Sequence, residues 1–156
     1  MEIIETESLT PEQKFQILEL WNSEYPESLM HANTGSFDEY LNPLKNQKHF
    51  LAVDNNKLLA WAFQFLRDSE QWFAIIVSGK SQGKGVGKKM IQKLKDNNAR
   101  LSAWVMDKED KKKINGEIYK SPLNFYLKNE FTIVPDVRLE TEKMSALKIQ
   151  WEKKTG

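Results

Sequence analysis

Hydrophobic residues recur with a helical period in the first part of the chain. Thr10, Pro11 and Gln13 form an N-terminal capping signal, with Thr at the N-cap, Pro at the first helical position and Gln at the capping-box position. The apolar residues after this signal predict one buried helical face: Phe15, Ile17, Leu18, Leu20 and Trp21. Tyr25-Pro26 is expected to end the helix, because the residue before a proline disfavours the helical conformation. A second, short helix is predicted over residues 36–44, from a Ser-Phe-Asp-Glu cap.

A period of two, or an unbroken run of apolar residues, marks the predicted strands. They cover residues 1–7, 49–53, 57–66, 72–77, 100–105, 131–134 and 146–151. Two further helices are expected, one over residues 86–97 and one that begins at Ser121-Pro122. The resulting order is β-α-α-β-β-β-α-β-α-β-β. No repeat, proline-rich linker or change of composition divides the chain, so we expect a single α/β domain over residues 1–156, with a mixed sheet of the α+β kind.

The composition excludes several classes of protein. The chain has 23 basic and 22 acidic residues and a net charge of +1, so neither a nucleic acid nor a membrane is an expected partner. It contains no cysteine, which rules out disulfides and thiolate metal sites, and no metal is expected. Glutamates near the N-terminus and the lack of an apolar run of about 18 residues argue against a signal peptide and a transmembrane helix. A cytoplasmic location is therefore expected.

The most informative segment is the glycine loop, which we define as residues 78–87. It connects the predicted strand 72–77 directly to the next predicted helix. Glycines allow close approach of the backbone, and the first N–H groups of a helix have no partner within that helix. A strand that leads through such a loop into a helix is therefore suited to bind phosphate groups. Lys80, Lys84 and Lys88 add positive charge around the loop.

Spacing distinguishes three kinds of phosphate-binding loop. A Walker loop requires four residues between its first glycine and Gly-Lys, whereas only three follow Gly79 here, and Gly85 replaces the hydroxyl residue that would hold Mg²⁺. A dinucleotide fingerprint requires G-x-G-x-x-G, whereas Gly83, Gly85 and Gly87 give G-x-G-x-G. The remaining pattern, Gln82-x-x-Gly-x-Gly, resembles the acyl-coenzyme A signature of the GNAT N-acetyltransferase superfamily. The alternative is an ordinary glycine-rich turn. At Gly85 and Gly87 we expect positive φ angles.

A second motif and the order of elements extend the resemblance to nearly the whole chain. Many GNAT members carry Phe/Leu-Tyr-x-Lys-x-Gly-Phe, and residues 125–131, Phe-Tyr-Leu-Lys-Asn-Glu-Phe, keep its Tyr, its Lys and its final Phe. Glu130 stands where glycine is usual, and such a glycine commonly forms the left-handed end of a helix. We expect Asn129 to take this conformation one residue earlier.

The resemblance implies acetyl-coenzyme A as cosubstrate and implies roles for individual residues. The loop amides and the helix N-terminus would hold the pyrophosphate, and a bulged or splayed strand at Ile76 and Val77 would pair with the pantetheine and the thioester oxygen. The residues implied in cofactor binding are Ile76, Val77, Gln82, Gly83, Lys84, Gly85, Val86, Gly87, Lys88, Asn124 and Lys128. Asn124 is shifted from the usual place of the family's asparagine. Tyr126 is implied as the general acid for the leaving thiolate, and the alternative is a core tyrosine with a satisfied hydroxyl.

The sequence does not define a general base. The strand 72–77 contains no carboxylate, so a base within it is excluded, and Glu24, Glu70 and His31 remain near the expected acceptor cleft. An isolated histidine in a loop is more often solvated, so a relay of water molecules is the expected route for the proton. The lysine-rich residues 108–113 are expected to form a solvated loop, and the alternative is that they attract the 3′-phosphate of coenzyme A.

The expected function is that of an N-acetyltransferase, which transfers the acetyl group of acetyl-coenzyme A directly to a primary amine of a small molecule or peptide. In the family's fold the acceptor is selected by the first two helices, their connection over residues 25–36 and the loop between the last two strands. Glu24, Glu27 and Asp136 are candidate contacts for a cationic amine. Two alternatives stay open: a non-catalytic acyl-coenzyme A binder or sensor on the same fold, and a protein-interaction module whose glycine loop is only a turn. A homodimer is also left open.

Overall fold

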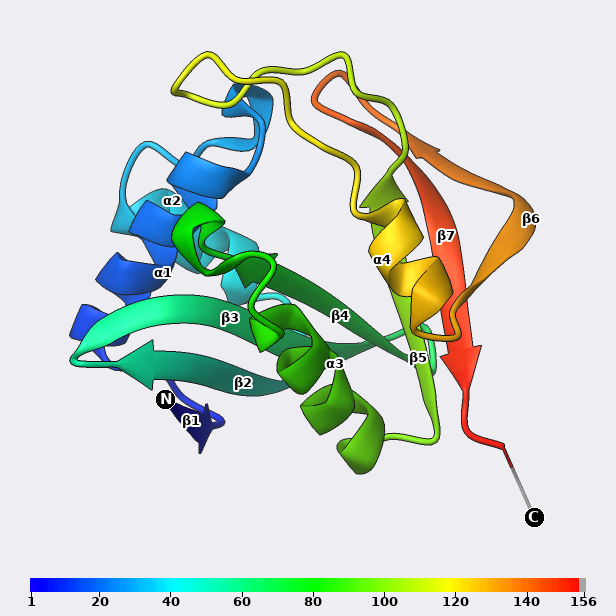
Figure 1. Ribbon diagram of the computed structural model, residues 1–156, viewed down its shortest axis with the longest axis horizontal. Coiled ribbons are helices and arrows are strands. Elements are labelled where there is room, and N and C mark those ends of the chain that lie inside the picture. The colour runs from blue at the N-terminus through cyan, green and yellow to red at the C-terminus, as the bar shows by residue number, and fades with distance from the viewer. Residues whose placement is uncertain (155–156) are drawn as a thin grey trace.

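A seven-stranded sheet runs through the computed structural model, which describes residues 1–154 (Figure 1). The strand order is β1-β2-β3-β4-β5-β7-β6. The strands are β1 (Glu2–Thr6), β2 (Lys45–Asp54), β3 (Lys57–Arg67), β4 (Glu70–Val77), β5 (Arg100–Met106), β6 (Thr132–Glu140) and β7 (Ser145–Glu152). The helices are α1 (Pro11–Glu24), α2 (Thr34–Leu41), α3 (Val86–Asn97) and α4 (Leu123–Lys128), with short 3-10 helices η1 (Glu27–Leu29) and η2 (Gly79–Ser81). The predicted mixed α/β fold is confirmed.

β4 and β5 are parallel neighbours that meet at one register position, where Trp72 lies opposite Ser102. The other neighbouring strands of the sheet pair antiparallel over longer stretches. β4 continues to Val77 and β5 to Met106, so the two strands separate beyond Trp72, as Figure 1 shows. The register between β3 and β4 has no shift, so the separation results from the divergence of β4 from β5 and not from a bulge in β4.

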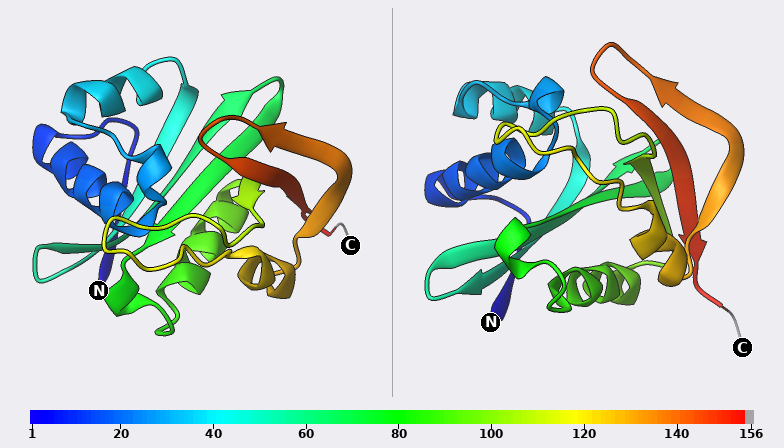
Figure 2. Two further views of the ribbon diagram at one scale, coloured as in Figure 1. Left: turned by 90° about the horizontal axis from the view of Figure 1, so that it is seen from above. Right: turned by 45° about the horizontal axis from the view of Figure 1, so that its top comes forward.

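The helices form a layer on each face of the sheet (Figure 2). Each layer has its own apolar core. On one face α3 and α4 pack against the sheet through residues such as Met90, Leu94 and Tyr126. On the other face α1 and α2 contribute Ile17 and Phe37 to a second cluster. No helix within residues 1–154 is both long enough and apolar enough to cross a membrane.

The start of α1 forms as predicted, but its buried face is narrower than expected. The backbone N–H of Gln13 donates to Thr10 Oγ1 at 3.1 Å and that of Thr10 donates to Gln13 Oε1 at 2.9 Å, so both bonds of the capping box are present. The prediction for Phe15 was wrong: its side chain is 54% exposed, whereas Ile17, Leu18, Leu20 and Trp21 are buried. Those four residues already fill the space against β3 and β4, and Phe15 lies outside the arc they occupy.

The second helix lies earlier in the chain than predicted. Asn33 is its N-cap and accepts a hydrogen bond from the backbone N–H of Ser36 at 2.9 Å, so α2 begins at Thr34. It ends at Leu41 because Pro43 cannot continue the helical hydrogen bonds. A cap three residues before the predicted one therefore determines the position of the helix.

The last strands are longer than the apolar runs that predicted them. β6 extends to Glu140, although Pro135 interrupts it, because a register shift lies between Ile133 and Arg138. Asp136, within the shift, has a φ of 60°. An irregular outer strand with a proline offers few continuous pairing groups to another sheet, which protects the edge of the sheet.

A buried histidine of β2 connects β3 to the end of α2 through hydrogen bonds. His49 is 1% exposed and its ring stacks on Trp61 and Phe63. Trp61 Nε1 donates to His49 Nδ1 at 3.1 Å, which leaves the hydrogen on Nε2 to bond Gln47 Oε1 at 3.0 Å. Gln47 in turn donates to the carbonyl oxygens of Leu41 at 2.6 Å and of residue 44 at 3.0 Å, at the end of α2. Burial, with Lys14 nearby, lowers the pKa of His49 to about 4.

We predict that this histidine makes stability depend on pH between about 6.5 and about 4. The unfolded chain binds a proton on His49 below pH 6.5 and the folded chain does not until about pH 4, so stability falls as the pH is lowered through this window. The expected loss is about 3 kcal/mol. Denaturant unfolding of the wild type and His49→Gln at several pH values measures it, and the variant should show the flatter slope. Equal slopes would show that other groups carry the dependence.

Candidate active site

A cleft of about 520 Å³ lies at the point where β4 and β5 separate. Its walls come from the end of β4, the glycine loop, the start of α3, the first residues of α4 and the end of α1. A volume of this size is typical of sites for small molecules and cofactors. The cleft brings together these residues that were implied in cofactor binding: Ile76, Val77, Gln82, Gly83, Gly85, Gly87 and Lys88. Tyr126 lines the same cleft.

The glycine loop presents its backbone to the cleft. Gly83 and Gly85 have φ angles of 78° and 82°, in the left-handed region, and a Cβ added to either would meet nothing within 4 Å. The space beside them is therefore open to a ligand. Gly85 is also the N-cap of α3 and has no side chain to accept hydrogen bonds from the first N–H groups of the helix. Those groups can bind an anion.

Gly87 has a different role from the other two glycines. A Cβ there would lie 3.4 Å from Cζ of Phe125 and 3.6 Å from Cγ2 of Val77. Gly87 does not have a left-handed φ, so the prediction of a positive φ holds for Gly85 and was wrong for Gly87. The absence of a side chain at Gly87 instead allows α3 to pack closely against α4 and the end of β4.

Four residues implied in cofactor binding do not line the cleft. Val86 is 6% exposed and packs into the core beneath α3. Lys84 is exposed at the outside of the glycine loop. Asn124 and Lys128 are exposed on α4, because this helix turns Phe125 and Tyr126 towards the cleft. Any contact of these three polar residues with a ligand would be made at the rim.

Tyr126 is held between aromatic rings. It is 5% exposed, and its ring lies 5.8 Å from that of Phe73, 5.2 Å from Phe125 and 5.5 Å from Phe131. Burial raises the pKa of the Tyr126 hydroxyl, and the nearby Tyr119 raises it further. The hydroxyl therefore keeps its proton at neutral pH, which a general acid requires.

The backbone that follows Tyr126 explains how the segment ends α4 without the usual glycine. The N–H of Phe131 donates to the carbonyl of Tyr126 at 3.1 Å and the N–H of Glu130 donates to that of Leu127 at 3.3 Å, which is a Schellman motif. Glu130 itself has a φ of 72°, whereas Asn129 has a φ of −100°. The expectation that Asn129 takes the left-handed conformation was wrong, because the two hydrogen bonds require it at residue 130.

The β5–α4 connection, residues 107–122, forms part of the cleft and was not identified from the sequence. It carries a small hairpin in which residue 112 pairs with residue 118, and the N–H of Glu27 donates to the carbonyl of Lys112 at 2.9 Å. Tyr119, Lys120, Ser121 and Pro122 line the cleft. Figure 2 shows this connection passing across the ends of the strands to α1. The expectation of a solvated loop over residues 108–113 agrees with the exposed residues 108–110 but was wrong for Lys113, whose half-buried side chain pairs with Glu24.

Tyr119, which is half-buried, is a second tyrosine in the cleft. Its ring lies 6.4 Å from that of Tyr25, which also lines the cleft, and burial raises the pKa of its hydroxyl. Tyr119 carries the same phenolic hydroxyl as Tyr126 but belongs to no motif. The hairpin that positions Tyr119 is held by contacts between residues distant in the sequence. Local patterns therefore gave no signal for it.

Of the candidate bases, only Glu24 lines the cleft. His31 is half-buried, where Nδ1 lies 2.9 Å from Ser36 Oγ and the ring packs 4.9 Å from Trp21, so the expectation of a solvated histidine was wrong. The side chain of Asn22 makes two hydrogen bonds of 2.9 Å to the backbone of His31, which fixes this loop on α1. Burial lowers the pKa of His31, and Lys143 lowers it further.

Glu70 belongs to β4 but lies at the far end of the strand from Val77. Its carboxylate accepts hydrogen bonds from Lys148 Nζ at 2.9 and 3.1 Å and from Gln150 Nε2 at 3.0 Å. Burial alone would raise the pKa of Glu70, but the hydrogen bonds from Lys148, Ser102 and Gln150 lower it overall. A carboxylate held in this way is a poor proton acceptor, and it is remote from the cleft.

Comparison with known proteins agrees with this geometry. The model of the acetyltransferase (GNAT) family matches residues 14–111. The chain belongs to this family. No curated protein matches it by sequence.

Solved structures show the same fold at low sequence identity. An aminoglycoside 6′-N-acetyltransferase complexed with coenzyme A is 15% identical over 97% of each chain, with a TM-score of 0.72. The aminoglycoside 6′-N-acetyltransferase from Enterococcus faecium is 14% identical over 97% of each chain, with a TM-score of 0.70. The ribosomal-protein-alanine N-acetyltransferase from Brucella melitensis is 11% identical over 97% of this chain and 99% of its own, with a TM-score of 0.70.

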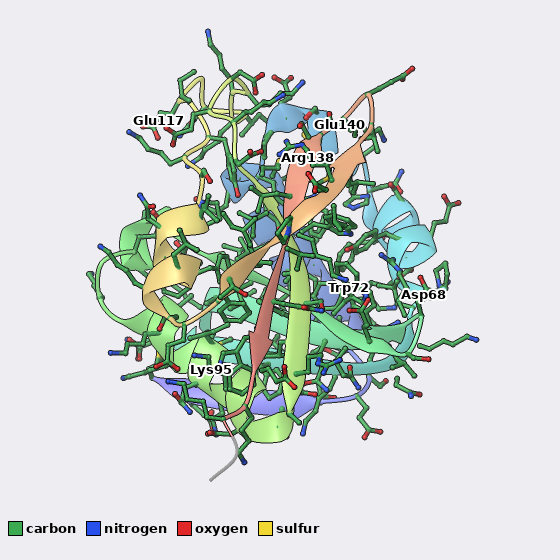
Figure 3. All side chains as sticks on the ribbon, turned by 90° about the vertical axis from the view of Figure 1, so that its right-hand side faces the viewer. Asp68, Trp72, Lys95, Glu117, Arg138 and Glu140 are labelled. Carbon is green, nitrogen blue, oxygen red and sulfur yellow. The ribbon has the colours of Figure 1, made fainter. Side chains whose placement is uncertain are left out.

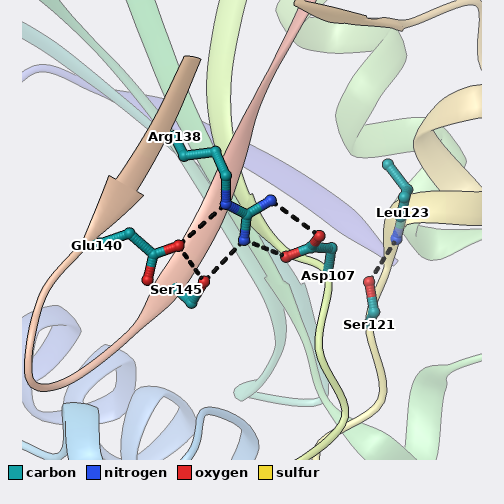
Figure 4. A network of polar contacts seen from close by, with 6 residues as sticks. All are labelled: Asp107, Ser121, Leu123, Arg138, Glu140 and Ser145. Carbon is teal, nitrogen blue, oxygen red and sulfur yellow. Dashed lines mark hydrogen bonds and ion pairs between the residues drawn. The ribbon is translucent and has the colours of Figure 1, made fainter. Parts of the chain in front are cut away.

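In this GNAT protein an arginine holds the end of β5 against the last hairpin. Arg138 donates two hydrogen bonds to Asp107, at 3.0 and 2.9 Å, and further bonds to Glu140 and Ser145 (Figure 4). Figure 3 shows Arg138 and Glu140 next to each other on β6. The hydrogen bond from Arg138 is the main cause that lowers the pKa of Asp107. This network fixes the point at which the β5–α4 connection leaves the sheet.

We predict that Glu130→Gly stabilises the protein by about 1 kcal/mol, because a left-handed φ costs a residue with a side chain roughly 1–2 kcal/mol and glycine recovers part of this. Thermal or denaturant unfolding measures the change. Lys128→Gly is the matched control, since residue 128 is helical and glycine there should destabilise by about 0.5–1 kcal/mol. A destabilised Glu130→Gly would mean that the Glu130 side chain makes a contact worth more than the strain.

Proposed function

We propose that the protein is an acetyl-coenzyme A-dependent N-acetyltransferase that transfers the acetyl group directly to a primary amine of a small molecule or peptide. The observation that carries this proposal is that one cleft contains the three parts such a reaction needs. They are the N-terminal amides of α3 behind left-handed glycines, the separated edge of β4 at Ile76 and Val77, and the protonated hydroxyl of Tyr126.

The residues present fit coenzyme A at two points. The open space beside Gly83 and Gly85, next to the N-terminus of α3, suits a pyrophosphate. Lys88 lines the cleft and supplies positive charge there. Beyond Trp72, the backbone groups of β4 that face β5 are not paired with that strand, so they can pair with the amides of a pantetheine chain. When bound, the cosubstrate supplies a thioester carbonyl as the electrophile.

The protein's own residues then orient the acceptor and move protons. Holding the amine against the acyl carbon makes the reaction effectively unimolecular, and this alone lowers the barrier substantially. The backbone N–H groups at the end of β4 stabilise negative charge that develops on the carbonyl oxygen. Tyr126 Oη holds a proton for the departing thiolate. Glu24 already accepts a hydrogen bond from the N–H of Gly79 and pairs with Lys113, so water remains the proposed acceptor of the amine's proton.

The experiment that tests the function combines binding with turnover. Calorimetry should detect coenzyme A binding to the wild type and none to Gly85→Val, because a branched side chain at a φ of 82° is strained and would occupy the space beside the helix N-terminus. Thiol release from acetyl-coenzyme A, screened over primary amines and peptides, should identify an acceptor. Binding without thiol release would favour a non-catalytic binder or sensor. No binding by the wild type would overturn both.

We predict that Tyr126→Phe lowers kcat with little change in the KM for acetyl-coenzyme A. The ring and its packing remain and only the proton donor is lost, so the effect belongs to the transition state. A general acid typically contributes about 10²–10⁴-fold, so a loss of this order is expected where chemistry limits turnover. Tyr119→Phe is the matched comparison, since it also removes a tyrosine hydroxyl from the cleft. Wild-type kcat in Tyr126→Phe with a large loss in Tyr119→Phe would transfer the acid role to Tyr119.

A further inference from the structure

Glu24 stands where three parts of the cleft meet. It is the last residue of α1, it lines the cleft, and its side chain is only 15% exposed. Its carboxylate approaches the glycine loop so closely that a Cβ on Gly79 would lie 3.5 Å from Oε2. A largely buried charge of this kind needs partners, because an unpaired carboxylate in such a position is disfavoured.

The two oxygens of Glu24 have different partners. Oε2 accepts a hydrogen bond of 2.9 Å from the backbone N–H of Gly79, at the start of the glycine loop. Oε1 lies 3.3 Å from Nζ of Lys113, whose side chain is 16% exposed. Lys113 is placed by the hairpin of the β5–α4 connection, where its own N–H donates to the carbonyl of Glu117 at 2.8 Å.

The bond to Gly79 orients the loop that leads to Gly83 and Gly85. Gly79 follows directly on Ser78, whose N–H donates to the carbonyl of Leu59 at 2.8 Å and so continues the pairing of β4 with β3. At Gly79 the chain leaves the sheet, and Glu24 accepts the first N–H that the sheet does not. The carboxylate thus defines the direction in which the loop starts.

A carboxylate that contacts the glycine loop and lines the same cleft as Gly83 and Gly85 creates an electrostatic conflict, because it repels the anion that the loop is suited to bind. Lys113 removes this conflict by neutralising Glu24. We propose that Glu24 is a positioning residue that fixes the start of the glycine loop for the pyrophosphate, and that Lys113 cancels the charge of Glu24 so that this support does not weaken phosphate binding. The proposal rests on the proposed function, since it assumes that coenzyme A occupies the cleft.

Four variants distinguish the positioning role of Glu24 from the neutralising role of Lys113. For each, calorimetry measures the Kd for coenzyme A. Glu24→Ala removes the acceptor for Gly79 and should raise Kd about tenfold or more, the effect of losing one hydrogen bond to a charged group. Glu24→Gln keeps an oxygen for Gly79 and should bind as well as the wild type. Lys113→Met leaves a bare carboxylate and should raise Kd by roughly threefold to tenfold, more at low salt. Glu24→Gln/Lys113→Met should return to within about twofold of the wild type, because the uncharged amide needs no neutralisation.

A second substrate distinguishes support of the phosphate site from general damage. S-acetylpantetheine lacks the pyrophosphate, so its KM should be unchanged in Glu24→Ala and Lys113→Met while the KM for acetyl-coenzyme A rises. Glu19→Ala is the control, because Glu19 is an exposed glutamate on the same helix, and it should leave both values unchanged. Should Glu24→Ala fail to fold, the Lys113→Met variant and the double variant carry the test.

Two results would overturn the inference. One is wild-type affinity in both Glu24→Ala and Lys113→Met. The other is an equal loss for S-acetylpantetheine and acetyl-coenzyme A, which would indicate a general structural role. Either result leaves the proposed function standing as long as the wild type binds coenzyme A, whereas a wild type that binds none removes the proposed function and this inference together.

Discussion

Backbone pairing between β4 and β5 stops after Trp72 and Ser102, and the cleft exists because of this interruption. A strand inside a sheet normally satisfies its N–H and C=O groups on both sides. Beyond Trp72, β4 is paired with β3 on one side and faces the opening on the other. Leaving a buried backbone group without a partner costs about 1–3 kcal/mol, so this edge favours water or a ligand that carries amide groups. The opening is thus a consequence of the topology before any side chain is considered.

Other features keep the two strands apart. On the β4 side, Gly87 allows α3 to approach Phe125 and Val77 closely, which fills the space beneath the opening with apolar contacts. On the β5 side, Arg138 binds Asp107 through two hydrogen bonds and holds the end of β5 to the last hairpin. Each strand end is therefore fixed to a different part of the molecule.

The sequence predicted the features that depend on neighbouring residues. The capping box of α1 and the left-handed Gly85 follow from local rules, and the structure contains both. The errors concern distant contacts: Phe15 follows the helical pattern but lies outside the arc that meets the sheet, and Tyr119 reaches the cleft through a hairpin supported by the backbone of Glu27. No local pattern specifies such contacts.

Glu130 shows how a motif can lose a residue and keep its geometry. The Schellman bonds from residues 130 and 131 require a left-handed backbone, and the ring of Phe131 packs 5.5 Å from that of Tyr126. These contacts outweigh the strain at Glu130, so the position of the tyrosine is preserved although the glycine is gone. The missing glycine therefore adds backbone strain at residue 130 but does not change the geometry of the cleft.

The side of the cleft that would receive an acceptor is formed by three segments far apart in the sequence. The N–H of Glu27 bonds the carbonyl of Lys112, and the hydroxyl of Ser28 donates to the carbonyl of Lys143 at 2.8 Å, so η1 connects the β5–α4 connection to the turn between β6 and β7. The acceptor in both bonds is a backbone carbonyl oxygen, which any residue at positions 112 and 143 would supply. The side chains at positions 112 and 143 can therefore vary without loss of the connections, whereas the second bond requires the hydroxyl of Ser28.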